Sequence, residues 1–260
     1  MSDSEIITSR DNAKLKLARS VRDGRETGLI FIEGVRLARE ALRSDLSIRS
    51  AFVSTAFSLD PTELLSNTRI NVSKVAERSF ASIADTENSQ GVVLIAERPT
   101  ASLDAFISDG PVVLLHRVNN PSNLGAVIRT AEAAGAAGIV TTTGSANAFS
   151  PKALRASMGS AFRLPIVEQV DFSDAIDWAG SKDLLTTAAD VSGSSSYADI
   201  DWTIPRLIVF GSEAHGLDER ELAMIHEKVT IPMKNEVESL NLAVSSGIIL
   251  FEAKRQRDSL

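Results

Sequence analysis

Residues 112–135 read VVLLHRVNNPSNLGAVIRTAEAAG, in which a short apolar run leads through an amide-rich turn into a longer segment. The run Val112–Leu115 predicts a buried strand, because four consecutive apolar residues leave no polar face. The segment Asn123–Ala134 predicts a helix, and Gly135 is a signal for its end. A buried strand followed by a helix is the unit from which parallel sheets are built.

The same alternation continues from this stretch to the C-terminus. Further strands are predicted at residues 138–142, 184–188, 207–210 and 229–231, and helices at residues 151–158, 217–226 and 240–255. In the last helix Leu240, Val244, Ile248 and Phe251 recur at helical spacing, whereas the patch Ser192–Ser196 reads as a surface loop. Strands separated by helices indicate an α/β fold with a mostly parallel sheet covered on both faces.

The first hundred residues predict a second, smaller α/β unit. Its strands are expected at residues 29–32, 51–54, 70–72 and 92–96, and its helices at residues 10–21 and 35–42. The charged, proline-containing run from Glu97 to Thr100 resembles a linker. We therefore expect an N-terminal domain at residues 1–97, a linker and entry helix at residues 98–110, and a larger domain at residues 111–260.

Composition excludes several classes of protein. The chain has 260 residues, of which 43% are hydrophobic, so it can bury a sizeable core. It has no cysteine, which excludes disulfides and cysteine-ligated metals, and its three histidines form no HxxxH pair, so no metal is expected. No apolar stretch approaches the roughly 20 residues that span a bilayer, and the N-terminus lacks an apolar signal core. We expect a cytoplasmic protein without membrane contact.

The net charge of −7, taken as a sum, argues against a nucleic-acid partner. The charge is unevenly distributed, because nine basic residues stand against five acidic ones between Ser9 and Arg43. Taken alone, this local excess favours an ordinary solvated helix face over an RNA surface.

Polar residues follow the strands of the C-terminal half, where open parallel sheets bind their ligands. These loops carry amides, a glutamate, an arginine and glycines. No GxGxxG, GxxxxGK[ST] or GxSxG sequence occurs. The usual dinucleotide fingerprint, the phosphate loop and the hydrolase nucleophile elbow are therefore excluded.

Several separated segments resemble the SpoU/TrmH family of RNA ribose methyltransferases, part of the SPOUT superfamily. The three family motifs are matched in order by residues 120–131 (NPSNLGAVIRTA), 211–216 (GSEAHG), and 231–233 (IPM) with 238–244 (ESLNLAV). Residues 150–159 resemble a further family stretch. The run from Thr8 through Phe31–Gly34 to Gln90–Val92 resembles an L30e-like substrate-binding domain. The chain departs from the family at Asn120, where members often have Asp.

The resemblance implies a fold and a cofactor. The N-terminal domain would be L30e-like, and the C-terminal domain a SPOUT α/β domain with a deep trefoil knot, a rare exception to unthreaded chains. Members are generally homodimers through the knotted region, where S-adenosylmethionine binds. The residues matching the cofactor positions are Thr187, Ala188, Gly211, Ile231 and Leu240. Gly211 suits this role because a residue without Cβ lets a ligand approach its backbone closely.

The resemblance also implies transfer of a methyl group to a ribose 2′-hydroxyl. Arg129 would activate that hydroxyl, and because arginine is protonated in water, we expect it to act by contacting the neighbouring phosphate. Asn123 and Asn241 would orient Arg129 and the ribose. Glu213 would fix their hydrogen bonds, and Ser239 would position backbone or substrate. Outside the resemblance, Asn123 would be an ordinary helix cap and Ser239 the N-cap of the last helix.

Within the resemblance, the basic N-terminal helix becomes an expected RNA surface. Contacts are expected at Arg10, Lys14 and Arg19, and at Arg155 in the C-terminal half. Because an L30e-like domain is typical of members that act on ribosomal RNA, rRNA of the 23S type is favoured over tRNA. His116 and His215 are expected to be structural or rim residues.

Two alternative functions remain. The first is a catalytically silent RNA- or ribosome-binding protein of the same fold, and the presence of Asn123, Arg129, Glu213 and Asn241 argues against it. The second is a base methyltransferase of the wider knotted superfamily, and the run Ser239–Asn241 argues against that.

Overall fold

The computed structural model describes residues 6–57, 64–65, 70–106, 110–234 and 237–259. Contacts group the chain into two compact units. Unit 1 comprises Met1–Pro99 and Phe149–Arg163, and unit 2 comprises Thr100–Ala148 and Leu164–Leu260. The expected boundaries at residues 97 and 111 stay a prediction, and these contacts place residues 149–163 with unit 1. Of the expected linker, residues 107–109 lie outside the described part, and the entry helix is one 3₁₀ turn, Leu103–Ala105.

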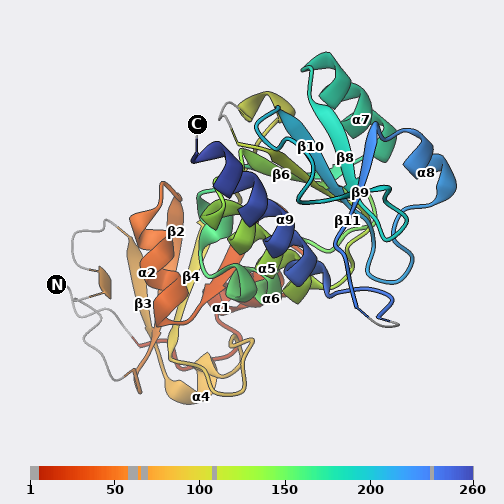
Figure 1. Cartoon of the computed structure of the whole chain (residues 1–260). Helices are drawn as coiled ribbons and strands as arrows, with labels where there is room; N and C mark the ends of the chain where they lie inside the picture. The colour runs from red at the N-terminus through yellow and green to blue at the C-terminus, as the bar shows by residue number, and fades with distance from the viewer. Residues whose placement is uncertain (1–5, 58–63, 66–69, 107–109, 235–236, 260) are drawn as a thin grey trace. The chain divides into compact units, whose positions relative to one another are not determined.

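Unit 1 is built on a mixed four-stranded sheet with the order β1-β4-β2-β3 (Figure 1). Its strands are β1 (Leu29–Glu33), β2 (Ile48–Ser54), β3 (Asn71–Val75) and β4 (Val92–Glu97). β4 pairs antiparallel with β1 and β2, and β2 pairs parallel with β3. Its helices are α1 (Ala13–Arg22), α2 (Val35–Arg43), α4 (Glu77–Phe80) and α6 (Pro151–Ser157), with the 3₁₀ turn η2 (Ser160–Phe162). The predicted small α/β unit is confirmed.

A buried carboxylate shapes the loop before β4. Glu33 at the end of β1 accepts hydrogen bonds from Asp85 N (3.0 Å), Thr86 N (3.1 Å) and Thr86 Oγ1 (3.0 Å). Gln90 Oε1 accepts from Val35 N (2.9 Å), the first residue of α2, after Gly34 turns the chain at φ 98°. Hydrogen bonds of Glu33 and Gln90 therefore connect the end of β1 and the start of α2 to the loop at residues 84–91.

Unit 2 is built on a parallel seven-stranded sheet with the order β7-β6-β5-β10-β8-β11-β9 (Figure 1). Its strands are β5 (Val112–Leu115), β6 (Gly138–Thr142), β7 (Ile166–Val170), β8 (Leu185–Ala189), β9 (Ser195–Ser196), β10 (Arg206–Phe210) and β11 (Glu227–Thr230). Its helices are α5 (Pro121–Ala133), α7 (Phe172–Ser181), α8 (Glu219–Ala223) and α9 (Leu242–Arg257). The predicted parallel α/β fold is confirmed.

The strand order places a late segment between earlier ones. β11 lies between β8 and β9, although both precede it in the sequence. After β10, the chain therefore re-enters the sheet as an inner strand, between two strands that come earlier in the sequence. The trefoil knot itself stays an expectation of the resemblance.

Three local expectations differ from the structure. β7 and α7 were not predicted. The edge strand β7 (IVEQV) has two adjacent polar residues among its five and fully buries only Ile166, so it lacks the continuous apolar run of the inner strands. The patch Ser192–Ser196 is not wholly a loop, since its last two residues form β9. Helix α8 covers only Glu219–Ala223 of the expected residues 217–226. Across the described ranges, no helix is long and apolar enough to cross a membrane.

Candidate active site

The candidate site lies at the carboxyl ends of adjacent parallel strands in unit 2. β5 leads through residues 116–120 into α5, and β10 leads into the loop Gly211–Gly216. β11 leads into the segment that precedes α9. Because these strands run parallel, the three motif segments meet at one edge of the sheet, where ligands bind in open α/β folds.

Three of the predicted catalytic residues form one hydrogen-bonded chain. Asn241 Nδ2 donates to Asn123 Oδ1 (3.3 Å), and Asn123 Nδ2 donates to Glu213 Oε1 (3.1 Å). The direction of this chain is fixed at Glu213, because a carboxylate only accepts, so Asn123 turns Nδ2 toward it and Oδ1 toward Asn241. Asn241 Oδ1 in turn accepts from Ala243 N (2.9 Å). The structure thus joins α9, α5 and the loop after β10 through side chains far apart in the sequence.

The helix caps differ from the alternatives that the sequence left open. Asn120, not Asn123, is the N-cap of α5, with its Oδ1 accepting from Ser122 N (2.9 Å). Asn241, not Ser239, is the N-cap of α9. Asn123 is therefore free of a capping role, and its side chain serves the contact with Glu213.

Arg129 is not part of this chain. It lies six residues after Asn123 on the same helix, about 600° of rotation and about 9 Å of rise, so the two side chains leave α5 from different faces. Arg129 is exposed and has no hydrogen-bond or ion-pair partner among the residues that the structure describes. Ser239 is also exposed, in the segment before α9.

The loop Gly211–Gly216 folds tightly on itself. Ser212 N donates to Gly216 O (3.2 Å), and Gly216 N donates to Ser212 O (2.9 Å). A Cβ on Gly211 would overlap the backbone of Gly216. Close approach of the loop's own backbone is therefore one reason for glycine at residue 211, and the expected close approach of a ligand stays a prediction.

The expected cofactor residues fall into two groups. Ile231 and Leu240 are half-buried beside the strand ends, as is Gly211. Thr187 and Ala188 lie inside β8, which pairs with β10 on one side and β11 on the other. The Thr187 hydroxyl accepts from Arg206 Nη1 (2.6 Å), and Ala188 is part of the core. The first group lies in the segments that follow β10 and β11, and its cofactor role stays a prediction, whereas the side chains of the second group are engaged inside the sheet and the core.

A pocket of about 550 Å³ opens beside the amide chain. Its wall contains Asn123 and Glu213 of that chain, the loop residues Ser212–Gly216, and Arg117. Three carboxylates line it, from Glu213, Asp218 and Glu221. His215 is exposed at this pocket, in agreement with the rim position expected for it.

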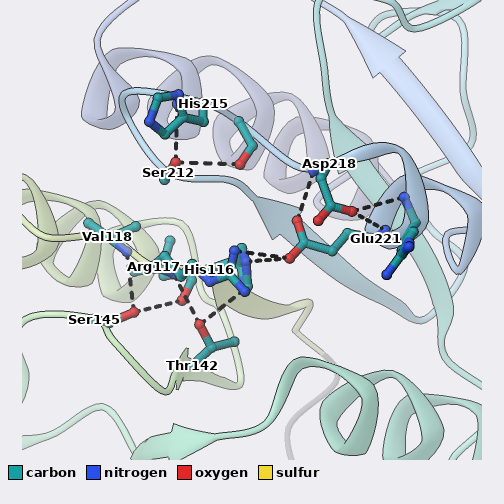
Figure 2. Close-up of polar contacts among 12 residues, drawn as sticks. His116, Arg117, Val118, Thr142, Ser145, Ser212, His215, Asp218 and Glu221 are labelled. Carbon is teal, nitrogen blue, oxygen red and sulfur yellow. Dashed lines mark hydrogen bonds and ion pairs between the residues drawn. The ribbon is translucent and has the colours of Figure 1, made fainter.

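Beneath the pocket a polar network joins β5, β6 and α8 (Figure 2). His116 is only 2% exposed, and its Nε2 lies 2.9 Å from Glu221 Oε1. Thr142 Oγ1 accepts from Arg117 N (3.0 Å) and lies 3.1 Å from His116 Nδ1. Glu221 also closes a capping box, accepting from Asp218 N (2.8 Å). The structural role expected for His116 agrees with this placement.

Burial keeps His116 neutral in this network. Desolvation lowers the pKa of His116 below its usual value of 6.5; the Glu221 carboxylate opposes the shift and the Arg117 guanidinium adds to it. A Thr142 hydroxyl that accepts from Arg117 N has its own proton free for His116 Nδ1. If Nδ1 accepts that proton, the neutral ring carries its own proton on Nε2, the nitrogen nearer to Glu221.

Arg117 is a pocket residue that the sequence did not single out. Its backbone is left-handed (φ 51°), its side chain is 58% exposed, and its Nη1 lies 3.5 Å from Glu221 Oε1. A non-glycine residue held in this conformation is uncommon and is found often at functional sites. Its position directly after β5 was the available signal, since the carboxyl ends of strands carry the site.

The expected RNA contacts of unit 1 are largely engaged within the protein. Arg19 donates to Ser82 Oγ (3.1 Å) and Arg10 O (2.8 Å), and Lys14 Nζ donates to Ser73 Oγ (3.2 Å). Arg10 Nη2 donates weakly to Arg78 O (3.4 Å). Arg155 forms an ion pair with Asp85 (2.6 Å). These cations are therefore not gathered as a free basic surface.

Comparison with known proteins defines the class. The model of the SpoU rRNA methylase family matches residues 110–251, more than half of the chain. The model of the MRM3-like substrate binding domain matches residues 12–94. The chain belongs to the SpoU rRNA methylase family.

Individual relatives cover almost the whole chain. The 23S rRNA (guanosine(2553)-2'-O)-methyltransferase of Bacillus subtilis is 28% identical, over 95% of this chain and 98% of its own length. The 23S rRNA (uridine(2479)-2'-O)-methyltransferase of Streptomyces viridochromogenes is 30% identical, over 97% and 93%. The crystal structure of the SpoU methyltransferase AviRb from S. viridochromogenes in complex with AdoMet matches with a TM-score of 0.87 and 29% identity, covering 95% of this chain and 99% of that one. An AdoMet-bound rRNA methyltransferase from Sinorhizobium meliloti matches with a TM-score of 0.86 and 32% identity, over 97% and 98%.

Proposed function

We propose that this protein transfers a methyl group from S-adenosylmethionine to a ribose 2′-hydroxyl of RNA, and that its target is ribosomal RNA of the 23S type. The observation that carries the proposal is the chain of hydrogen bonds from Asn241 through Asn123 to Glu213. It assembles three separated motifs at the carboxyl ends of parallel strands. The rRNA target is supported by the relatives that act on 23S rRNA at similar full length. Such a target agrees with the cytoplasmic location expected from the sequence.

The strand ends of unit 2 fit this cofactor. The half-buried Ile231 and Leu240 offer apolar surface for an adenine ring, and the loop that begins at Gly211 offers backbone groups. In the described part of the chain no cluster of His, Cys, Asp or Glu is arranged to hold a metal ion. When bound, S-adenosylmethionine supplies a methyl group on a positively charged sulfur. We assign Gly211, Ile231 and Leu240 to cofactor contacts, and no side-chain contact to Thr187 or Ala188.

The remaining residues handle the RNA. Asn123, held by Glu213 and Asn241, orients the ribose through an amide whose direction is already set. Arg129, exposed and without a partner in the described structure, binds the phosphate beside the target and thereby positions the ribose that carries the 2′-hydroxyl. Ser239, exposed in the segment before α9, positions the substrate. Alignment of the reacting groups then supplies much of the rate.

We also propose that the protein acts as a homodimer through α9. The periodic residues Val244, Ile248 and Phe251 do not face the unit's own core, and Val244 and Phe251 are each 50% exposed. The buried face of α9 is formed instead by Leu242, Ser246, Ile249, Leu250 and Ala253. An apolar stripe on the opposite face of a helix is explained by burial against a second copy.

The test measures transfer of labelled methyl groups to rRNA. We expect Arg129→Ala to lower the rate about a hundredfold or more, as removal of a group that stabilises developing charge does. Glu213→Ala is expected to lower it about tenfold to a hundredfold, because the Asn123 amide loses its acceptor. Glu213→Gln keeps an acceptor oxygen and should lose less. Arg220→Ala, which removes another exposed arginine of unit 2, is the matched control and should leave the rate unchanged.

Two outcomes would contradict the proposal. Wild-type protein that binds RNA but transfers no label would support the silent RNA-binding alternative. Label on a base rather than a ribose, located by mass spectrometry of nuclease digests, would support a base methyltransferase.

A further inference from the structure

The cations of helix α1 hold unit 1 together. Arg22 Nη1 donates to the carbonyl oxygens of Ser82 (3.2 Å) and Ala84 (3.0 Å), and Arg19 bonds Ser82 Oγ from the turn before. These bonds fasten α1 to the segment that leads into residues 84–91. An arginine that satisfies buried carbonyl groups is not free to bind phosphate without releasing them.

Helix α2 presents a different set of cations. Arg36, Arg39 and Arg43 are spaced i, i+3 and i+7, so they form one stripe that extends about 10 Å along the helix. All three are exposed, and none has a hydrogen bond or ion pair with any residue in the described ranges. The only acid of α2, Glu40, is occupied by Arg163 (2.7 Å). The stripe is therefore an uncompensated positive surface on a protein with net charge −7.

The start of α2 adds to this field. Its first turn contains no acidic residue, and only the amide of Val35 is capped, by Gln90. The N-terminal end of a helix carries a partial positive charge, which favours anions nearby. Arg36 stands in this first turn, so its positive charge lies at the same end of the helix as the partial positive charge of the dipole.

The face lacks the features of a protein or membrane contact. None of the large hydrophobic residues that are exposed in the described structure belongs to α2. Protein interfaces are usually anchored by aromatic or apolar side chains, whereas contacts to a nucleic-acid backbone can be made by arginine and other polar groups without an apolar anchor. We propose that the α2 stripe of Arg36, Arg39 and Arg43 binds the phosphate backbone of the RNA substrate. This proposal rests on the proposed function and replaces α1 by α2 as the principal RNA surface of unit 1.

The experiment compares two triple variants of the full chain. Arg36→Gln/Arg39→Gln/Arg43→Gln removes the stripe, and Lys16→Gln/Lys74→Gln/Arg78→Gln removes three other exposed cations of unit 1 as the matched control. Affinity for an rRNA fragment is measured by fluorescence anisotropy at several salt concentrations, and methyl transfer is measured as kcat and KM for the same RNA. Binding of S-adenosylmethionine, followed by calorimetry, reports whether the site of unit 2 is intact.

We expect the stripe variant to bind RNA roughly 10- to 100-fold more weakly at 0.1 M salt. When the logarithm of its RNA-binding constant is plotted against the logarithm of salt concentration, the slope should be smaller in magnitude by about 2–3. Each lost phosphate contact reduces that slope by about 0.7–0.9. KM for RNA rises by a similar factor, while kcat and cofactor affinity stay at the wild-type values. The control variant should keep the wild-type salt slope.

Equal loss in both triple variants would overturn the proposal, because net charge rather than the stripe would then set the affinity. Unchanged affinity and KM in the stripe variant would overturn it as well. Failure of the proposed function looks different, because wild-type protein itself would then transfer no methyl group to RNA.

Discussion

His116 is a buried histidine whose environment predicts a pH-dependent stability. Its lowered pKa means that, as the pH falls below the usual 6.5, the unfolded chain takes up a proton that the folded protein refuses. Stability is thus full above pH 6.5 and declines below it, by at most about 1.4 kcal/mol per pH unit. The groups facing the ring are Glu221, Arg117, Asp218, Thr142 and Phe172.

Urea unfolding at pH 7.5, 6.5 and 5.5 measures this effect. The wild-type unfolding free energy is expected to decline between pH 6.5 and 5.5, and His116→Gln, a neutral polar replacement, to remove that decline. Carboxylates with a lowered pKa do not titrate in this pH range. Asp201, Asp218 and Glu252 stabilise the folded protein less only when the pH falls below their ordinary pKa values of 3.8–4.5. Hydrogen bonds from Arg255 and Gln256 lower the pKa of Glu252 to about 2. An identical decline in both proteins would show that another group titrates.

For single residues, the sequence predicts which side chains share a site better than it predicts why a given residue type stands at its position. Asn123, Glu213 and Asn241 were expected in one site, and the structure joins them. Gly211 was expected to let a ligand approach its backbone, which stays a prediction, and the structure adds a second reason, the close approach of Gly216. Arg117 was missed because its left-handed backbone is a property of the folded turn and has no signature in residue type.

At the scale of elements, the loop at residues 84–91 depends on one carboxylate. Glu33→Ala leaves Asp85 N, Thr86 N and Thr86 Oγ1 without their acceptor, so we expect a loss of about 2–3 kcal/mol in unfolding free energy. Glu33→Gln keeps one acceptor oxygen and should lose less than half of that. Chemical denaturation gives both values, and a loss that is the same for Ala and Gln would mean that the charge, not the hydrogen bonds, matters.

The elements that could be predicted are those whose apolar residues form a continuous run or recur at regular spacing. β5 and β6 begin and end at the expected residues, because all of their side chains are buried. β7 and β9 escaped prediction, since strands at sheet edges keep polar residues and depend on pairing with distant neighbours. Pairing across the sequence cannot be read from a local pattern.

At the scale of the molecule, the open point is whether residues 149–163 belong to the C-terminal domain expected at residues 111–260 or to unit 1. Phe149, Leu154 and Phe162 of this segment are buried, and Arg155 and Arg163 form ion pairs with Asp85 and Glu40 of unit 1. A fragment of residues 111–260 exposes these apolar side chains, each worth about 1.5–3 kcal/mol of burial. We expect the fragment to aggregate on gel filtration and to bind a hydrophobic dye, unlike the full chain.

A fragment with Phe149→Ser, Leu154→Ser and Phe162→Ser is the control and should be more soluble. A fragment of residues 111–260 that stays monodisperse and melts at the full-length temperature would support independent folding within the boundaries expected from the sequence.

The face of α9 leads to the last expectation, which concerns assembly. Periodicity predicted the helix correctly, but the residues that carried it, Val244 and Phe251, point away from the core of the described chain. The pattern therefore reports a surface that a single copy leaves exposed. Val244→Glu with Phe251→Glu places two charges on that surface and should convert the dimer to monomer in sedimentation velocity, with little change in far-UV circular dichroism. Ile204→Glu, at a similarly exposed apolar residue (43%) outside α9, should remain dimeric. A wild-type protein that sediments as a monomer at all concentrations would instead mean that the stripe serves a different partner.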